Sequence, residues 1–238
     1  MQFLSTITVL LGVACWCLLD DAEVGERESA LDLGAVTLVL TTPAVWWIAL
    51  VVLCAYSAYW ASFYFTPYAG DVFALSVGAA GAISVARQWL KPLAASLAGV
   101  VADRLGVARA CSALFAVLAV VFTGFVVMPV DARLAWVVLS IAVAALAIFA
   151  LRGIYFALLE ESQVPTALTG TAVGVISVVG YTPDITMPLL GGWLLDAYPG
   201  VTGYRYFYGA TAMLCALGGF AAWRLMARGV SSRAPIAS

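Results

Sequence analysis

The sequence predicts an all-α integral membrane protein, because its composition and the length of its apolar runs both require a lipid environment. Of the 238 residues, 64% are hydrophobic and only 10% are charged. A typical soluble domain is about 45–50% apolar and about 25% charged. A soluble domain of this length would still expose a large surface, and this chain has too few charged side chains to cover it.

About seven segments are long enough to cross a bilayer, which requires about 20 predominantly apolar residues. Backbone polar groups in lipid must be satisfied within the segment, so each run is predicted to be a helix. The runs are residues 3–19, 43–66, 73–101, 108–129, 134–158, 167–195 and 205–228. Short breaks with turn-forming or charged residues separate them, among them Thr66-Pro67 and Glu160-Glu161.

One longer polar and acidic stretch, Asp20–Asp32, separates the first run from the other six. The composition therefore divides the chain into one helix and a six-helix block. The predicted parts are a transmembrane helix over residues 1–19, a cytoplasmic linker with a short amphipathic segment over residues 20–42, a six-helix bundle over residues 43–228 and a cytoplasmic tail over residues 229–238.

The distribution of arginines predicts the orientation. When the helices alternate across the membrane, Arg104, Arg109 and Arg224 fall on the side that is richer in arginine, and Arg133 and Arg205 fall on the other. Loops that are rich in Lys and Arg face the cytoplasm. We therefore expect a multi-pass protein of a bacterial inner membrane with its C-terminus in the cytoplasm.

The composition also argues against several classes of function. The chain has no histidine, and its five cysteines lie in apolar runs without a C-x-x-C spacing. They are interpreted as small buried hydrophobic residues. No nucleophile with an adjacent base and no basic face stands out. We therefore expect no metal, no cofactor, no nucleic-acid partner and no enzymatic activity.

Residues 99–109 carry a motif, G-x-x-x-D-R-x-G-x-x-R, formed by Gly99, Asp103, Arg104, Gly106 and Arg109. The motif lies in a predicted cytoplasmic loop between the second and third helices of the six-helix block. It resembles the signature loop of the major facilitator superfamily of transporters, which carry it between their second and third helices and, more weakly, between the eighth and ninth. Residues 152–196 are similar to the tenth and eleventh helices of one bacterial subgroup of that superfamily.

The resemblance implies that the chain contains the last helix of an N-terminal half and a complete C-terminal half. Members of the superfamily have twelve helices in two halves, with the substrate bound between them. The expected partners are therefore a small-molecule solute, the lipid bilayer, and either the missing N-terminal half or a second copy of this chain. The resemblance gives the motif residues a conformational role at the cytoplasmic side. The alternative is a plain turn with a topology-setting arginine.

Two cations, Arg87 and Lys91, stand one helical turn apart within the run 73–101. A charged residue at the centre of a membrane helix costs roughly 2.5–3.5 kcal/mol on insertion scales, so such residues usually have a function. One interpretation is that both face a wet cavity and bind an anionic group of a solute, Arg87 as a planar fork and Lys91 as a point charge. The other is a buried ion pair with an acidic residue of a neighbouring helix.

Asp184 lies well inside the run 167–195, between Pro183 and Pro188, where we expect the helix to be interrupted. Interrupted helices near the membrane midplane often border transporter sites. Asp184 is therefore a candidate for a carboxylate that couples proton movement to transport. The alternatives are an ion pair with Arg87 or Lys91, or a position near the outer end of a tilted helix.

An aromatic stripe is predicted on one helix face, because Tyr56, Tyr59, Trp60 and Phe63 follow the i, i+3, i+4, i+7 spacing. Tyr56 and Trp60 are candidates for lining the substrate cavity, or they belong to an aromatic belt at the membrane interface. The belt is the interpretation for Tyr59 and Phe63 and also for Tyr64 and Tyr68.

Arg152 lies about two turns before the Glu160-Glu161 end of its predicted helix. Its side chain either extends to the cytoplasmic surface or pairs with Glu160 or Glu161 in one conformation, as part of an inner gate. Both interpretations remain open at this point.

The sequence as a whole predicts a secondary active transporter of the major facilitator type that works by alternating access. A positively charged cavity favours a small organic anion as the solute. The alternative is a membrane scaffold or sensor that kept the fold without transport. In that case the charges of Arg87 and Lys91 would be dispensable.

Overall fold

The computed structural model describes residues 6, 9, 12–14, 16, 33–162 and 164–232. All regular elements in these residues are helices. The chain divides into two compact units, Met1–Leu33 and Gly34–Ser238. The predicted first helix, apart from scattered positions, the acidic linker Asp20–Asp32 and residues 233–238 of the predicted tail lie outside the described residues.

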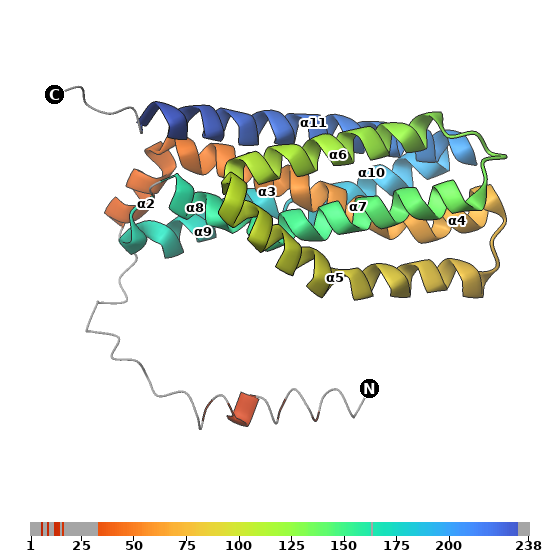
Figure 1. Cartoon of the computed structure of the whole chain (residues 1–238), viewed down its shortest axis with the longest axis horizontal. Helices are drawn as coiled ribbons and strands as arrows, with labels where there is room; N and C mark the ends of the chain where they lie inside the picture. The colour runs from red at the N-terminus through yellow and green to blue at the C-terminus, as the bar shows by residue number, and fades with distance from the viewer. Residues whose placement is uncertain are drawn as a thin grey trace. The chain divides into compact units, whose positions relative to one another are not determined.

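In the second unit, six helical rods run side by side and roughly parallel to one another (Figure 1). A short apolar helix, α2 (Leu33–Thr41), precedes them. Three rods are single helices, α5 (Val77–Leu105), α6 (Val107–Val127) and α11 (Val201–Ser232). The other three rods are interrupted. In the first, α3 (Pro43–Ala61) continues through η1 (Ser62–Tyr64) into α4 (Phe65–Phe73), and in the second, α7 (Leu134–Ile154) continues through η2 (Tyr155–Ala157) into α8 (Leu158–Glu161). The third begins with η3 (Thr166–Leu168) and α9 (Thr169–Gly180), which α10 (Pro183–Ala197) follows.

Five of the six rods are long and apolar enough to cross a membrane, so the protein is a multi-pass α-helical membrane protein with five candidate spans in the described part. The sixth rod, α5, is not among them. Its 29 residues extend about 43 Å at the helical rise of about 1.5 Å per residue. However, Arg87, Gln88 and Lys91 make its middle polar. The charges that distinguish α5 in the sequence thus also make it less apolar than the five candidate spans.

The first rod corrects the predicted break at Thr66-Pro67. The chain stays helical to Phe73 because Pro67 falls in the first turn of α4, where a proline N–H is not needed. The rod ends at Ala74, which takes a left-handed conformation with φ of 51°. The Ser76 side chain then accepts a hydrogen bond from the backbone N–H of Ala79 at 3.3 Å and caps α5.

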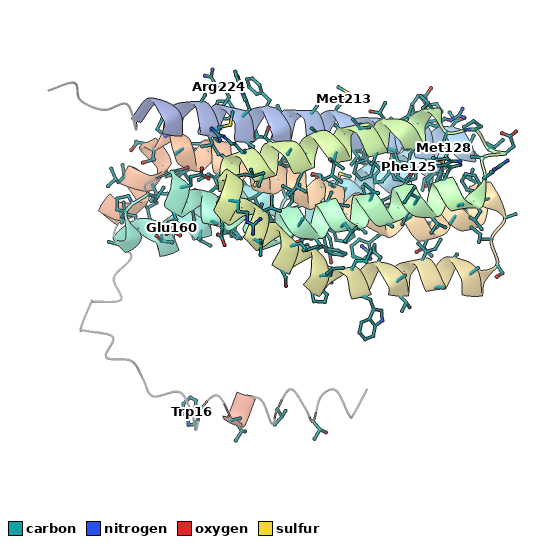
Figure 2. The ribbon with its side chains drawn as sticks, viewed as in Figure 1. Trp16, Phe125, Met128, Glu160, Met213 and Arg224 are labelled. Carbon is teal, nitrogen blue, oxygen red and sulfur yellow. The ribbon has the colours of Figure 1, made fainter. Side chains whose placement is uncertain are left out.

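The last helix, α11, packs closely against α3 and α6 through Gly218. A Cβ at this position would lie 2.5 Å from the Phe115 ring of α6 and 2.7 Å from the Cβ of Cys54 in α3. Cys54, Cys111 and Cys215 are free and buried, which confirms the prediction for these three cysteines. Figure 2 shows Phe125 inside the bundle and Met213 on the outward face of α11, and their side chains are 0% and 75% exposed.

A cluster of aromatic rings fills the bundle near the end of α4. Tyr68 lies 5.6 Å from Phe125 and 5.4 Å from Tyr208 between ring centroids, and it is 1% exposed. The assignment of Tyr68 to an interfacial belt is therefore wrong, because its ring packs inside the bundle. The Tyr204 hydroxyl donates to Asp71 Oδ2 at 2.6 Å. In contrast, the buried hydroxyls of Tyr68 and Tyr208 have no hydrogen-bond partner among the described residues.

We expect Tyr208→Phe to leave the thermal stability of the detergent-solubilised protein unchanged or to raise it by about 1 kcal/mol, because the substitution removes a buried hydroxyl that has no partner. The matched variant Tyr204→Phe should lower stability by about 1 kcal/mol, because it removes the hydrogen bond to Asp71. The measurement is thermal unfolding followed by circular dichroism. A larger loss for Tyr208→Phe than for Tyr204→Phe would contradict this assignment.

Candidate functional site

Three cations meet within the bundle, and we call Arg87, Lys91 and Arg152 the cationic cluster. Arg87 and Lys91 come from α5, and Arg152 comes from the last turn of α7. All three lie against one set of rings, the aromatic wall, formed by Tyr56, Tyr59, Phe63 and Phe149. The sequence pointed to Arg87 and Lys91 as a pair, and the structure adds Arg152 to them.

Arg87 is the most enclosed member of the cluster, with 3% of its surface exposed. Its guanidinium donates a hydrogen bond to Ser62 Oγ. Its Cζ lies 4.5 Å from the centroid of the Phe63 ring and 6.0 Å from that of Phe149. A desolvated cation over an aromatic face is stabilised by about 2 kcal/mol. The Phe63 ring and the Ser62 hydroxyl thus stabilise the charged guanidinium of Arg87.

Lys91 and Arg152 complete the cluster, and both are partly exposed. Lys91 Nζ lies 5.2 Å from the Phe149 centroid, and Arg152 Cζ lies 3.9 Å from the Tyr59 centroid. Lys91 is close enough to Arg87 and Arg152 to be repelled by both charges. Among the described residues, no group accepts a hydrogen bond from the buried Arg152 Nη1. The cluster therefore holds like charges together and leaves a donor free.

Asp184 lies across the aromatic stripe from the cluster, in the first turn of α10. Its Oδ1 accepts a hydrogen bond from Trp60 Nε1 at 2.7 Å. The Tyr56 ring packs against Tyr181 at 4.7 Å between centroids, which holds the α9–α10 junction against α3. The positive end of the helix dipole also stabilises an acid in the first turn. Asp184 thus has a hydrogen bond and a helix terminus to stabilise its charge.

The predicted interruption of this helix is found, but one turn earlier than expected. The chain leaves the helix at Tyr181-Thr182, directly before Pro183, and α10 continues through Pro188. Pro183 fits this position, because it occupies the first residue of α10, where a backbone N–H is not needed. The interruption therefore places Asp184 at a helix start.

The aromatic stripe has two different roles. Of the predicted cavity residues, Tyr56 lies against Arg152 and Trp60 donates a hydrogen bond to Asp184. The rings of Tyr59 and Phe63 contact Arg152 and Arg87, and the assignment of these two residues to an interfacial belt stays a prediction. The i, i+3, i+4, i+7 spacing carried this signal, since it places all four rings on one face. Nothing in the sequence singled out Ser62 or Phe149, which reach the site through contacts between helices.

The loop that carries the motif of residues 99–109 is contacted by Glu161, which lies outside the motif. Gly106 has φ of 90°, which favours glycine, and a Cβ there would lie 3.2 Å from Glu161 Oε1. Glu161 Oε2 accepts a hydrogen bond from the backbone N–H of Ala108 at 2.8 Å, near the start of α6. Glu161 thus ties the end of α8 to the α5–α6 loop.

The remaining predicted loop and gate residues are placed as follows. Asp103, Arg104 and Arg109 are exposed at the α5–α6 junction, as is Glu160 at the end of α8, and no atom outside its own helix lies within 4 Å of a Cβ built on Gly99. Arg152 lies on the rings of Tyr59 and Tyr56. Its pairing with Glu160 or Glu161 in another conformation stays a prediction.

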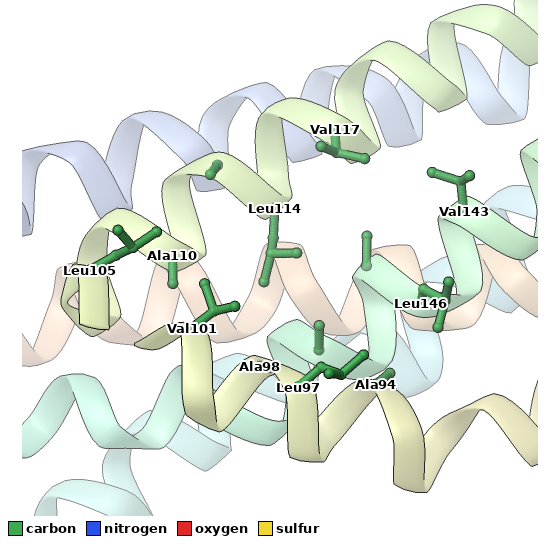
Figure 3. Close-up of a pocket in the computed structure, with 13 residues that line it drawn as sticks. Ala94, Leu97, Ala98, Val101, Leu105, Ala110, Leu114, Val117, Val143 and Leu146 are labelled. Carbon is green, nitrogen blue, oxygen red and sulfur yellow. The ribbon is translucent and has the colours of Figure 1, made fainter. Parts of the chain in front are cut away.

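A separate cavity of about 360 Å³ lies between α5, α6 and α7 (Figure 3). Its lining consists of alanine, leucine and valine side chains, among them Leu97, Leu114 and Leu146. None of the residues of the cationic cluster lines it. This cavity accepts hydrocarbon and offers no polar group for a solute, so the candidate site is the cationic cluster with its aromatic wall.

Comparisons with known proteins agree with a membrane location. The chain is 25% identical over 220 residues to a protein of Escherichia coli (strain K12) named inner membrane protein YihN, an alignment that covers 88% of this chain and 52% of that protein. It is also 25% identical over 213 residues to inner membrane protein YqcE of the same organism, covering 84% of this chain and 50% of that protein. The chain thus spans about half the length of these curated relatives. No protein family and no solved structure matches it.

We expect Glu161→Ala to lower thermal stability by about 1 kcal/mol, because it removes the hydrogen bond that satisfies a free N–H near the start of α6. The adjacent Glu160→Ala is the matched control, and this exposed residue should change stability by less than about 0.5 kcal/mol. Thermal unfolding in detergent micelles measures both. Equal effects would remove Glu161 as the link between α8 and the loop.

Proposed function

We propose that this chain is the solute-holding part of a secondary active transporter of the major facilitator type, and that its solute is a small organic anion. The cationic cluster carries this proposal. Three positive charges within an apolar bundle are expensive, and such charges in membrane proteins usually mark the path of a substrate or ion. Lys91 and Arg152 are partly exposed, so a solute has access to them.

The proposed mechanism is alternating access, with this six-rod bundle forming one side of the solute site and a second bundle forming the other. The chain spans about half the length of its relatives, which supports a partner of similar size. We propose that the partner is an N-terminal half or a second copy of this chain. The proposed orientation places the C-terminus in the cytoplasm, because the loop arginines favour that side.

One observation favours a second candidate function, a scaffold or sensor without transport. Arg87 is nearly fully buried and is held by Ser62 and Phe63, as expected for a structural cation. In a scaffold, Lys91 would have no role that offsets its repulsion by the other two charges. Transport measurements on variants of the less buried cations separate these two functions.

We expect Lys91→Gln to lower the uptake of organic anions into proteoliposomes by about ten-fold or more, because it removes one charge that holds the solute. Thermal stability should stay equal or rise, since the substitution relieves like-charge repulsion. Arg224→Gln is the matched control, because Arg224 is an exposed cation that lies 5.7 Å from the Trp47 ring. Uptake that is unchanged in Lys91→Gln would remove Lys91 from the solute site, whereas the absence of uptake by the unchanged protein would favour the scaffold.

Asp184 is the proposed coupling carboxylate, since it lies beside the site and can take up a proton. We expect Asp184→Asn to reduce uptake driven by a proton gradient by about ten-fold or more and to preserve exchange of solute across the membrane. Asparagine keeps an oxygen that accepts the hydrogen bond from Trp60. If gradient-driven uptake and exchange persist equally, Asp184 does not couple protons to transport.

A further inference from the structure

We propose that the cationic cluster binds its solute through a phosphoryl group that carries two negative charges, so that the solute is a phosphate monoester or a phosphonate. This inference rests on the proposed function and specifies the solute class of the same site. It comes from three features of the cluster: its net charge, the direction of its free donors and the rings behind it.

The first feature is charge. The cluster brings together three cations. Asp184, the carboxylate across the aromatic stripe, is already stabilised by the Trp60 hydrogen bond and by the start of α10. One carboxylate against three cations leaves an excess of two positive charges. Charge excess is costly in a medium of low dielectric constant. A phosphate monoester carries about −1.5 to −2 near pH 7, which neutralises this excess, whereas a carboxylate supplies one negative charge.

The second feature is the set of hydrogen-bond donors. Arg152 Nη1 is buried and has no acceptor among the described residues. Arg87 gives one hydrogen bond to Ser62 and has further N–H groups, since a guanidinium has five donors. Lys91 adds an ammonium group with three donors. These donors come from two helices, α5 and α7. A phosphoryl group has three acceptor oxygens and suits three separate donors better than a planar carboxylate does.

The third feature is the aromatic wall. The guanidinium carbons of Arg87 and Arg152 lie over the rings of Phe63 and Tyr59, at 4.5 and 3.9 Å from the ring centroids. A ring has no lone pair that accepts a strong hydrogen bond, so the N–H groups of a guanidinium beside it stay available for a bidentate contact. The rings therefore stabilise the cations without neutralising them. An acidic side chain in the same place would have consumed both the charge and the donors.

The test compares two probes that have the same shape and differ by one charge. Phenyl phosphate loses its second proton at a pKa of about 6, whereas phenyl sulfate stays a single anion throughout the range used. Binding to the full chain in nanodiscs of neutral lipid is measured by calorimetry near pH 7.5 and near pH 5. We expect phenyl phosphate to bind about ten-fold or more tightly than phenyl sulfate near pH 7.5. Near pH 5 the difference should largely disappear.

Phenyl sulfate also reports any titration of the protein itself, because its own charge does not change. The titratable groups near the cluster are Tyr56, Tyr59, Tyr155, Tyr181 and Asp184. Arg152→Gln and Lys91→Gln should each weaken phenyl phosphate about ten-fold and phenyl sulfate less, and Arg224→Gln should change neither. Circular dichroism checks that each variant is folded. The pH series on the unchanged protein tests the proposal even where a variant fails to fold.

Two outcomes would overturn the inference, and they differ in what they leave standing. If both probes bind with equal affinity and phenyl phosphate shows no pH dependence beyond that of phenyl sulfate, the site recognises a single negative charge. The proposed transport of an organic anion then survives. If neither probe binds at either pH, the cluster is not an anion site in this chain, and the proposed function loses its main support.

Discussion

The structure depends on how it stabilises positive charge inside an apolar bundle. Arg87 is 3% exposed in a protein whose other rods are apolar enough to cross a membrane. A bare cation in such surroundings carries a large desolvation cost. Aromatic faces from two rods, together with the Ser62 hydroxyl, offset part of this cost for the cluster. The rings of Phe63 in η1 and Phe149 in α7 thus face the cations that α5 carries.

The interruptions of the rods fall beside the residues of the site. The 3₁₀ turn η1 carries Ser62 and Phe63, and the turn η2 begins three residues after Arg152. The break at Tyr181-Thr182 directly precedes the start of α10 and Asp184. A 3₁₀ segment in the middle of a helix often marks a functional hinge. The three uninterrupted rods include α6 and α11, which pack closely through Gly218. The interruptions of the other rods thus lie beside the site, whereas α5, which carries Arg87 and Lys91, is a single helix.

The sequence predicted more of the fold than of the site, for a physical reason. Helix α6 spans Val107–Val127 where apolar length predicted 108–129, because burial of the backbone in lipid requires a continuous helix. The break at Thr66-Pro67 was predicted wrongly, because a proline in the first turn of a helix looks the same in sequence as one that ends it. Arg87 and Lys91 were visible as charges in an apolar run. In contrast, the place of Arg152 beside them depends on how α5 and α7 pack, and no local pattern encodes that contact.

Rings and acids stabilise a buried cation with different consequences. A carboxylate neutralises the charge and occupies its donors, so the pair is closed to any third group. A ring attracts the cation through its quadrupole and leaves the net charge unchanged. The cluster uses rings, and the acid Asp184 is held separately by Trp60 at the start of α10. This separation leaves the positive charge of the cluster uncompensated by a direct ion pair among the described residues. A cation with only a structural role tolerates either kind of partner, whereas a site that must bind and release an anion needs the net charge and the N–H groups that rings leave available.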